Sequence, residues 1–193
     1  MRFVVPVPTI YARPNRKFFG PKRGITWLSM INDQAAGLGA KVVSGTPRDS
    51  LHMIDALYAR DGGQRPDIVV TDTGSYSDLV FGLVHLLGMS YRPQLADLPD
   101  QQLWRINPDA SYGRIFKSLH VLTYVDDETY RRDIKGQSNL TEGRYDLGRT
   151  VFHGHKGEIY QRYHVGMEEQ LGALGLVLNC IVLWNTFYMN AAI

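Results

Sequence analysis

Asp72 stands at a point in the chain where a carboxylate can hold a metal ion. Residues 68–70 are an apolar run of β-forming side chains, Asp72 follows, and residues 79–87 repeat as an apolar helix. A strand that ends at an Asp and turns into a helix places that carboxylate at the C-terminal edge of a sheet, where open α/β folds bind ligands and metals. The segment equally fits a structural role, in which Asp72 or Ser77 caps the helix or shapes the turn.

Glu168 and Glu169 are the acids that could complete such a site. They immediately precede a long apolar stretch, so the helix dipole alone would favour an acid there. The functional interpretation joins Glu168 to Asp72 around Mg²⁺, which prefers hard oxygen ligands. In phosphoryl transfer two such ions, about 3.5–4 Å apart, clamp the attacking and leaving oxygens.

The segment of residues 13–23 concentrates positive charge. Its cations are Arg13, Arg16, Lys17, Lys22 and Arg23, and it contains Phe18 and Phe19 but no acid. Cations neutralise nucleic-acid phosphates and aromatic rings can stack on bases, so the pattern suits DNA binding. A solvated loop with two anchoring phenylalanines fits the pattern as well.

Composition indicates one soluble globular domain. The 193 residues carry a net charge of +2, but residues 1–50 hold eight basic and two acidic side chains, whereas residues 51–112 hold four basic and eight acidic ones. Cys180 is the only cysteine, which excludes an internal disulfide and fits a reducing cytosol. The N-terminal apolar run is too short for a signal peptide, so we expect a cytoplasmic protein.

The elements that must position these residues follow from periodicity and turn signals. Strands are expected at residues 3–7, 24–31, 41–43, 68–70 and around 91–95, and helices at 46–60, 79–87, 116–132 and 167–189. Loops are expected at 11–23 and 137–143, and residues 147–163 are ambiguous. This order predicts an α/β sheet with an antiparallel hairpin portion and helices packed on it.

The uncharged C-terminal stretch, residues 171–193, has the length of a membrane span. Glycines and asparagines interrupt it, and no basic flank follows it. We therefore predict a helix buried against the sheet and no membrane partner.

Long stretches of this sequence resemble the C-terminal catalytic domain of one family, the Tn-three family of replicative class II transposases. The matching words are residues 2–7, 32–34, 45–50, 71–81, 86–88, 124–128, 151–154, 168–176 and 183–186. The resemblance covers nearly the whole chain.

This resemblance implies an RNase H-like fold, a mixed sheet flanked by helices, with an Asp-Asp-Glu metal site. Asp72 matches the second Asp and Glu168 the Glu, with Glu169 as the less favoured alternative. The implied activity is Mg²⁺-dependent cleavage and strand transfer of double-stranded DNA at transposon ends and target, with Mn²⁺ as a substitute ion. A cytoplasmic, nucleoid-associated bacterial protein, homo-oligomeric at full length, is also implied.

Departures from the family pattern set the expected domain organisation. The family's first Asp would lie two residues before Met1. In the family, a helical segment of several dozen residues follows a Tyr-Gly word. Here Tyr112 and Gly113 match that word, but the segment does not follow them. We expect residues 1–193 to form a single partial catalytic domain, incomplete at its first strand and with an internal deletion near 113–116. The alternative function is a catalytically inactive remnant that at most binds DNA.

Overall fold

The structure, a computed structural model, describes residues 2–5, 12–44, 49–59, 65–101, 112–152 and 167–192. Within these ranges the side chains of residues 49, 152, 167–170 and 172 are not described. The chain divides into two compact units: unit 1 is Met1–Asp61 with Thr141–Ile193, and unit 2 is Gly62–Leu140.

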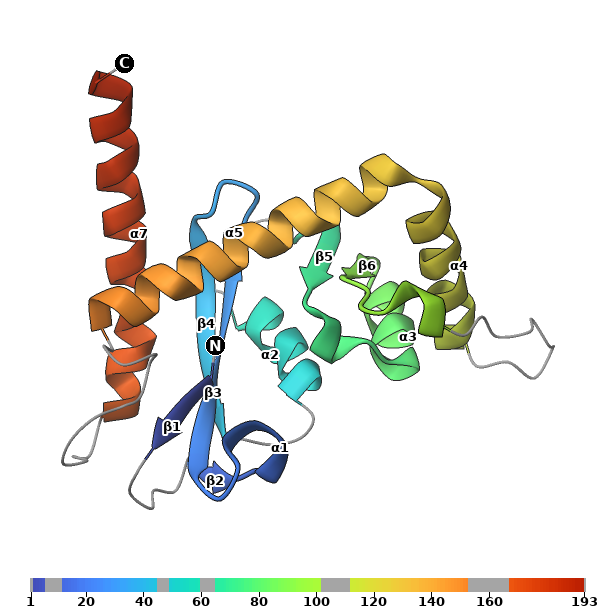
Figure 1. Cartoon of the computed structure of the whole chain (residues 1–193), viewed down its shortest axis with the longest axis horizontal. Helices are drawn as coiled ribbons and strands as arrows, with labels where there is room; N and C mark the ends of the chain where they lie inside the picture. Colours follow the sequence, from blue (N-terminus) through green and yellow to red (C-terminus); the bar gives the residue numbers. More distant parts are fainter. Residues whose placement is uncertain are drawn as a thin grey trace. The chain divides into compact units, whose positions relative to one another are not determined.

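Unit 1 is built on an antiparallel sheet whose long middle strand pairs with all the others (Figure 1). Its strands are β1 (Arg2–Val5), β2 (Arg13–Pro14), β3 (Arg23–Ile31) and β4 (Gly37–Ser44), with β1, β2 and β4 each antiparallel to β3. The β3–β4 hairpin turns through Asn32, whose side chain accepts hydrogen bonds from the backbone N–H groups of Gln34 and Ala36.

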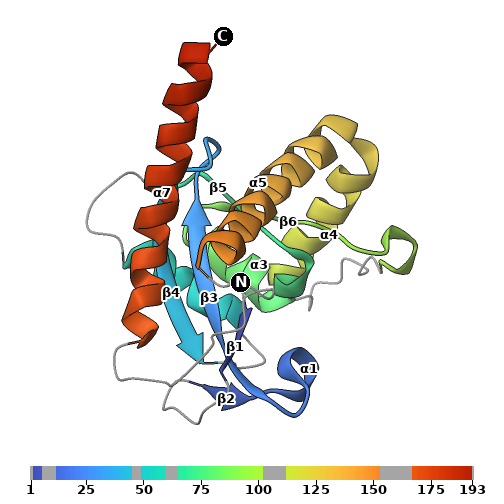
Figure 2. The ribbon, with the colours of Figure 1, turned by 60° about the vertical axis from the view of Figure 1, so that its left-hand side comes forward.

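Helices cover the two faces of this sheet (Figures 1 and 2). On one face, Ile25 and Trp27 of β3 pack against α7 (Met167–Ala192). The α7 residues buried in this core are Leu171, Leu174 and Leu178. The opposite face carries η1 (Asp49–Leu51) and α2 (His52–Tyr58). Because successive side chains of a strand point to opposite faces, the sheet can pack against a helix on each face.

Unit 2 is a small β-α-β arrangement with added helices. Strands β5 (Ile68–Thr71) and β6 (Ser90–Pro93) are parallel, and the connection between them runs through η2 (Thr73–Ser75) and α3 (Asp78–Leu86). η3 (Leu98–Asp100), α4 (Tyr112–Asp126) and the first part of α5 (Glu128–Phe152) complete the unit. Parallel strands require such a crossover, which explains the helix between them.

The interior of unit 2 is aromatic. Phe81 of α3 meets the rings of Tyr91 and His120 with centroids 4.9 and 5.5 Å apart. The backbones of α3 and α4 approach closely at Gly82 and Gly113, where neither residue adds a side chain.

Most expected elements are confirmed. The strands of the N-terminal half, the strand before Asp72, the helix after it and the strand near residue 91 all form, as does the long C-terminal helix. The expected loop at 11–23 is wrong in part, because β2 and the short helix α1 (Arg16–Phe19), capped by Asn15, lie within it. The helix expected from residue 46 begins at His52 in α2, while its expected cap, Thr46, lies outside the described residues.

The loop expected at residues 137–143 is wrong. This segment is the middle of α5, which runs unbroken from Glu128 to Phe152, whereas the helix expected to continue to residue 132 ends at Asp126. Gly136 and Gly143 lower helix propensity, but Ile134 and Arg144 are buried on either side of them and hold the helix by tertiary packing.

The prediction that the C-terminal helix is buried is confirmed only for its first half. Leu171, Leu174 and Leu178 are buried, yet Leu183 and every later described residue of α7 are exposed. Within the described part of the chain, the window Ala173–Ala192 of α7 is long and apolar enough to cross a membrane by length and composition, and 11% of it is buried. The described strands form two sheets, and the α/β class is confirmed.

Candidate metal site and nucleic-acid interface

Asp72 lies immediately after β5 in unit 2, and its carboxylate is exposed at the end of a parallel strand. The side chain caps η2, since Oδ1 accepts a hydrogen bond from the backbone N–H of Gly74 at 3.1 Å. No ion pair to Asp72 is present among the described residues. The structural role considered for Asp72 is therefore real, and it leaves Oδ2 available for another partner.

The loop that carries Asp72 is fixed by Tyr91 of β6, a contact that the sequence did not reveal. The Tyr91 hydroxyl donates to the Ser75 carbonyl oxygen at 3.0 Å and lies 2.9 Å from Thr71 Oγ1. Burial is the main reason that the pKa of Tyr91 is raised, so the phenol stays protonated and can donate. These bonds hold the side chain of Thr71 and the backbone of Ser75, which lie on either side of Asp72.

Ser77 is the true cap of α3: its Oγ accepts from the backbone N–H of Val80 at 3.3 Å. Asp78, one residue later, forms ion pairs with Arg114 and Lys117 of α4, each at 3.1 Å. The two acids of this segment thus differ: Asp78 pairs with Arg114 and Lys117, whereas no described cation pairs with Asp72.

Glu168 and Glu169 lie in the first turn of α7, in unit 1. Their side chains fall outside the described part of the structure, so their approach to Asp72 of unit 2 stays a prediction. Among the described side chains no group of three or more His, Cys, Asp or Glu residues could hold a metal ion. The described contribution to a metal site is the Asp72 carboxylate, a hard oxygen donor of the type that Mg²⁺ and Mn²⁺ accept.

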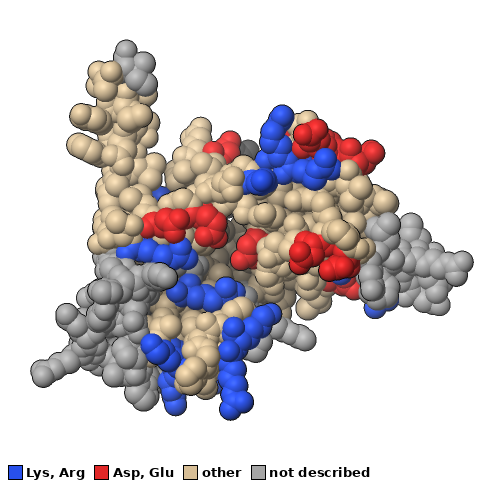
Figure 3. Space-filling model, viewed as in Figure 1, with Lys and Arg blue, Asp and Glu red and all other residues tan. Residues whose placement is uncertain are grey.

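The five cations expected to bind DNA are brought together at one end of unit 1. Arg13 on β2, Arg16 and Lys17 on α1, Lys22 in the following turn and Arg23 on β3 are all exposed. Figure 3 shows Lys and Arg gathered over this region, with no described acid among them. We call these five residues the basic cluster.

The phenylalanines within the cluster serve the fold. Phe19 is buried against Gly24, where any Cβ would clash with its ring. Phe18 is half-buried, with the Arg2 guanidinium 3.8 Å and the Lys17 ammonium 5.3 Å from its ring centroid. Phe19 therefore anchors the segment, whereas Phe18 makes a cation–π contact with Arg2 of β1, and base stacking on Phe18 stays a prediction.

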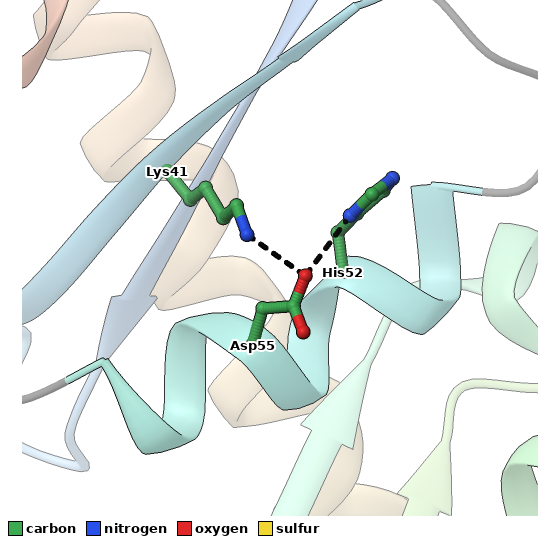
Figure 4. A network of polar contacts seen from close by, with 3 residues as sticks. All are labelled: Lys41, His52 and Asp55. Carbon is green, nitrogen blue, oxygen red and sulfur yellow. Dashed lines mark hydrogen bonds and ion pairs between the residues drawn. The ribbon is translucent and has the colours of Figure 1, made fainter.

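A second polar group, at Asp55, links α2 to β4 (Figure 4). Asp55 Oδ2 lies 2.8 Å from Lys41 Nζ and 3.2 Å from His52 Nδ1. The hydrogen bond from Lys41, followed by that from His52, lowers the pKa of Asp55. The group is exposed and its carboxylate is already engaged by Lys41, so it fastens the helix to the sheet and does not form a metal site.

In a comparison with known protein families, one family model matches the whole chain. The model, described as the Tn3 transposase DDE domain, matches residues 1–113 and 109–193. No solved structure matches the chain.

Curated relatives align over the full chain. The transposase for transposon Tn4556 of Streptomyces fradiae is 50% identical over 253 residues, which cover 100% of this chain and 28% of that protein. The transposase for transposon gamma-delta of Escherichia coli K12 is 38% identical over 253 residues, covering 100% of this chain and 25% of that protein. The chain thus spans about a quarter of the length of these relatives.

Proposed function

Because the chain belongs to the Tn3 transposase DDE domain family, we propose that it acts in DNA transposition as part of a metal-dependent strand-cleavage and strand-transfer site. The observation that carries this proposal is the Asp72 carboxylate, which is exposed at the C-terminal end of a parallel strand and accepts a hydrogen bond from the Gly74 N–H. Its proposed setting is the bacterial cytoplasm, on nucleoid DNA.

We assign Asp72 and Glu168 as ligands of Mg²⁺, with Mn²⁺ as a substitute. The hard oxygen of Asp72 fits such an ion, and the cap to Gly74 uses only Oδ1. When bound, the cation supplies charge stabilisation to a phosphate undergoing substitution. The protein's part is to orient the Asp72 carboxylate through the Thr71–Tyr91–Ser75 bonds and to hold the DNA backbone with the basic cluster.

For the fold we propose an RNase H-like arrangement that unites the antiparallel strands of unit 1 with the parallel strands of unit 2. The order of the elements supports it: an antiparallel hairpin, then a helix, then a strand that ends at the acid. We also propose that the relatives carry an internal segment that this chain lacks near 113–116. The two family matches meet at 109–113, and the alignments extend over 253 positions against 193 residues here.

A second candidate is a protein that binds DNA without cutting it. The observation that favours it is the basic cluster, which needs no metal ion to contact phosphates.

Substitution of Asp72 by Asn separates capping from metal binding. Asn caps helical turns about as well as Asp, so the free energy of unfolding should change by less than about 0.5 kcal/mol. Loss of the carboxylate charge should abolish Mg²⁺- or Mn²⁺-dependent cleavage of duplex DNA carrying a transposon end, measured on supercoiled plasmid. Asp33→Asn, a change of the same kind in the exposed β3–β4 turn, serves as the control and should retain cleavage.

Absence of cleavage by the unmodified chain with either ion would reject the enzymatic proposal. Retained DNA binding in that experiment would support the second candidate.

A further inference from the structure

A single side chain of α7, that of Asn179, binds both backbone polar groups of Gly37 at the start of β4. Its Oδ1 accepts a hydrogen bond from the Gly37 N–H at 2.8 Å, and its Nδ2 donates to the Gly37 carbonyl oxygen at 3.0 Å. The same Oδ1 accepts from Arg144 Nη2 at 2.6 Å. A Cβ on Gly37 would lie 2.8 Å from Asn179 Oδ1 and 2.5 Å from Arg144 Nη2, so glycine leaves the room that this contact needs. We call these three residues the α7 clamp.

The hairpin that the α7 clamp holds is itself fixed. The side chain of Asn32 accepts from the Ala36 N–H across the β3–β4 turn, and Ala35 is held there at φ 60°, in the left-handed region that alanine rarely adopts. The Ala35 carbonyl oxygen accepts from Arg144 Nη1 at 3.2 Å, which ties the turn to α5. The α7 clamp therefore joins α7 to a turn that cannot shift without breaking several hydrogen bonds.

The α7 clamp supplies a fixed register that the leucine core of α7 does not. Burial of Leu171, Leu174 and Leu178 determines which side of α7 faces the sheet, but apolar contacts are non-directional and permit small rotations and shifts along the axis. Hydrogen bonds weaken steeply when their distance or angle changes. Three of them meet at Asn179, where α7 runs beside β4 (Figure 2), and together they define the rotation and axial position of the helix.

The helix carries this register to its first turn, where Glu168 and Glu169 lie. Position 168 precedes Asn179 by eleven residues, close to three full turns, so the two positions are about 16 Å apart along the axis and only about 20° apart around it. Position 169 is about 80° from Asn179 and falls on the side of the helix opposite the buried leucines. A rotation fixed at Asn179 therefore favours Glu168 over Glu169 as the metal ligand.

We propose that Asn179 is a positioning residue of the metal site, because the α7 clamp sets the rotation and axial position of α7 from which Glu168 reaches the cation. The inference rests on the proposed function, in which Glu168 is a ligand of Mg²⁺ or Mn²⁺. Asn179 is three turns away from Glu168, so it acts through the helix and does not touch the ion.

The test is Mn²⁺ binding by the purified chain, measured without DNA from the electron paramagnetic resonance signal of free Mn²⁺. Asn179→Ala should weaken binding about tenfold, the lower end of the range for residues beyond the direct ligands. Glu168→Gln should weaken it at least as much. Adding Asn179→Ala to Glu168→Gln should then have no further effect, because Asn179 acts through Glu168. A merely structural role would lower the affinity by the same factor in both backgrounds.

Two controls and a second variant complete the design. Asn185→Ala removes the same amide at an exposed position of α7, and Glu169→Gln removes the neighbouring charge; both variants should bind Mn²⁺ as the unmodified chain does. Gly37→Ala disturbs the α7 clamp from β4 and leaves Asn179 in place, so it should also weaken binding. It carries the test if circular dichroism shows that Asn179→Ala does not fold.

Three results would overturn the inference alone: unchanged Mn²⁺ affinity in the folded clamp variant, an equal loss in the Glu168→Gln background, or an equal loss in Asn185→Ala. Three others would reject the proposed ligand Glu168 and this inference with it. They are no Mn²⁺ binding by the unmodified chain, unchanged binding in Glu168→Gln, and a larger loss in Glu169→Gln than in Glu168→Gln.

Discussion

His120 of unit 2 is a buried imidazole held in one tautomer by its neighbours. Nε2 lies 2.9 Å from the Pro93 carbonyl oxygen, which can only accept, so Nε2 carries the proton. Nδ1 then accepts from the Tyr130 hydroxyl at 2.9 Å. Burial is the main cause that lowers the pKa of His120 from 6.5 to about 4.

Stability should therefore fall in acid through His120. The folded-state pKa lies below the unfolded value, so the unfolded chain takes up the proton first, and the loss begins below pH 6.5 and is complete below about pH 4. Its size is about 3 kcal/mol at most. Urea unfolding between pH 7 and pH 4 measures it. His120→Gln should flatten this dependence, and an unchanged pH profile in that variant would contradict the assignment.

Arg144 of α5 is a buried cation, and its hydrogen-bond partners among the described residues are neutral. It donates to the carbonyl oxygens of Ala35 and Gly175 at 3.2 and 2.9 Å and to Asn179 Oδ1 at 2.6 Å. Burial lowers the pKa of Arg144, yet its planar fork suits these separate acceptors. It thereby joins α5, α7 and the β3–β4 hairpin within unit 1.

Arg144→Ala should destabilise unit 1 by about 3 kcal/mol, because it removes a buried side chain and leaves the part-buried carbonyl oxygens of Ala35 and Gly175 without this donor. Chemical denaturation followed by circular dichroism gives the value. Arg149→Ala on the same helix removes only a partly exposed ion pair with Asp146, and it should cost less than about 1 kcal/mol. Equal costs for the two variants would show that Arg144 is not a structural link.

At the scale of elements, the contact between α3 and α4 depends on two glycines. A Cβ on Gly113 would collide with the Asp78 carbonyl oxygen and crowd the Gly82 nitrogen, both of which are backbone atoms. α4 begins at Tyr112 and is continuous through residues 113–116. The proposed absence of an internal segment is therefore compatible with a well-packed helix pair.

Gly113→Ala should destabilise unit 2 by about 2 kcal/mol or more, although alanine favours helices, because the backbones must separate. Gly136→Ala in α5 is the matched control. A Cβ there meets nothing within 4 Å, so this variant should gain about 1 kcal/mol from helix propensity. Thermal unfolding of both variants reads out the opposite signs, and stabilisation by Gly113→Ala would refute the close approach of α3 and α4.

On the scale of the whole molecule, the small net charge conceals a strong asymmetry. The basic cluster is a local surface of unit 1, whereas the formal charge of the full chain is only +2. DNA binding should accordingly depend on this cluster more than on the total charge.

If all five cations of the basic cluster contact phosphates, log K for duplex DNA should fall with log salt at a slope of about −4.5. Arg16→Ala/Lys17→Ala should reduce the magnitude of that slope by about 2. Fluorescence anisotropy over a KCl series measures both. Arg132→Ala/Lys135→Ala makes the same charge change at exposed positions of α5 in unit 2. An equal reduction in this control would show that binding is not centred on the cluster.

The sequence by itself determined the elements whose signals are local. An alternating stretch of β-forming residues predicted β3, and an apolar run predicted β5. An apolar helical repeat predicted α3, with Asp72 or Ser77 as its cap, and the structure shows that Ser77 is the cap. Sequence words identified the family, and charge clustering located the cations that the fold brings together. Because these features depend on neighbouring residues, they can be predicted without knowledge of the fold.

Only the tertiary structure decided the rest, because it depends on contacts between distant residues. The continuity of α5 across Gly136 and Gly143 follows from burial of Ile134 and Arg144. Tyr91 fixes the Asp72 loop from 16 to 20 residues away, and no local pattern marks it. The apolar pattern of α7 predicts that part of this helix is buried. Only its packing against the sheet determines which residues are buried and which stay exposed.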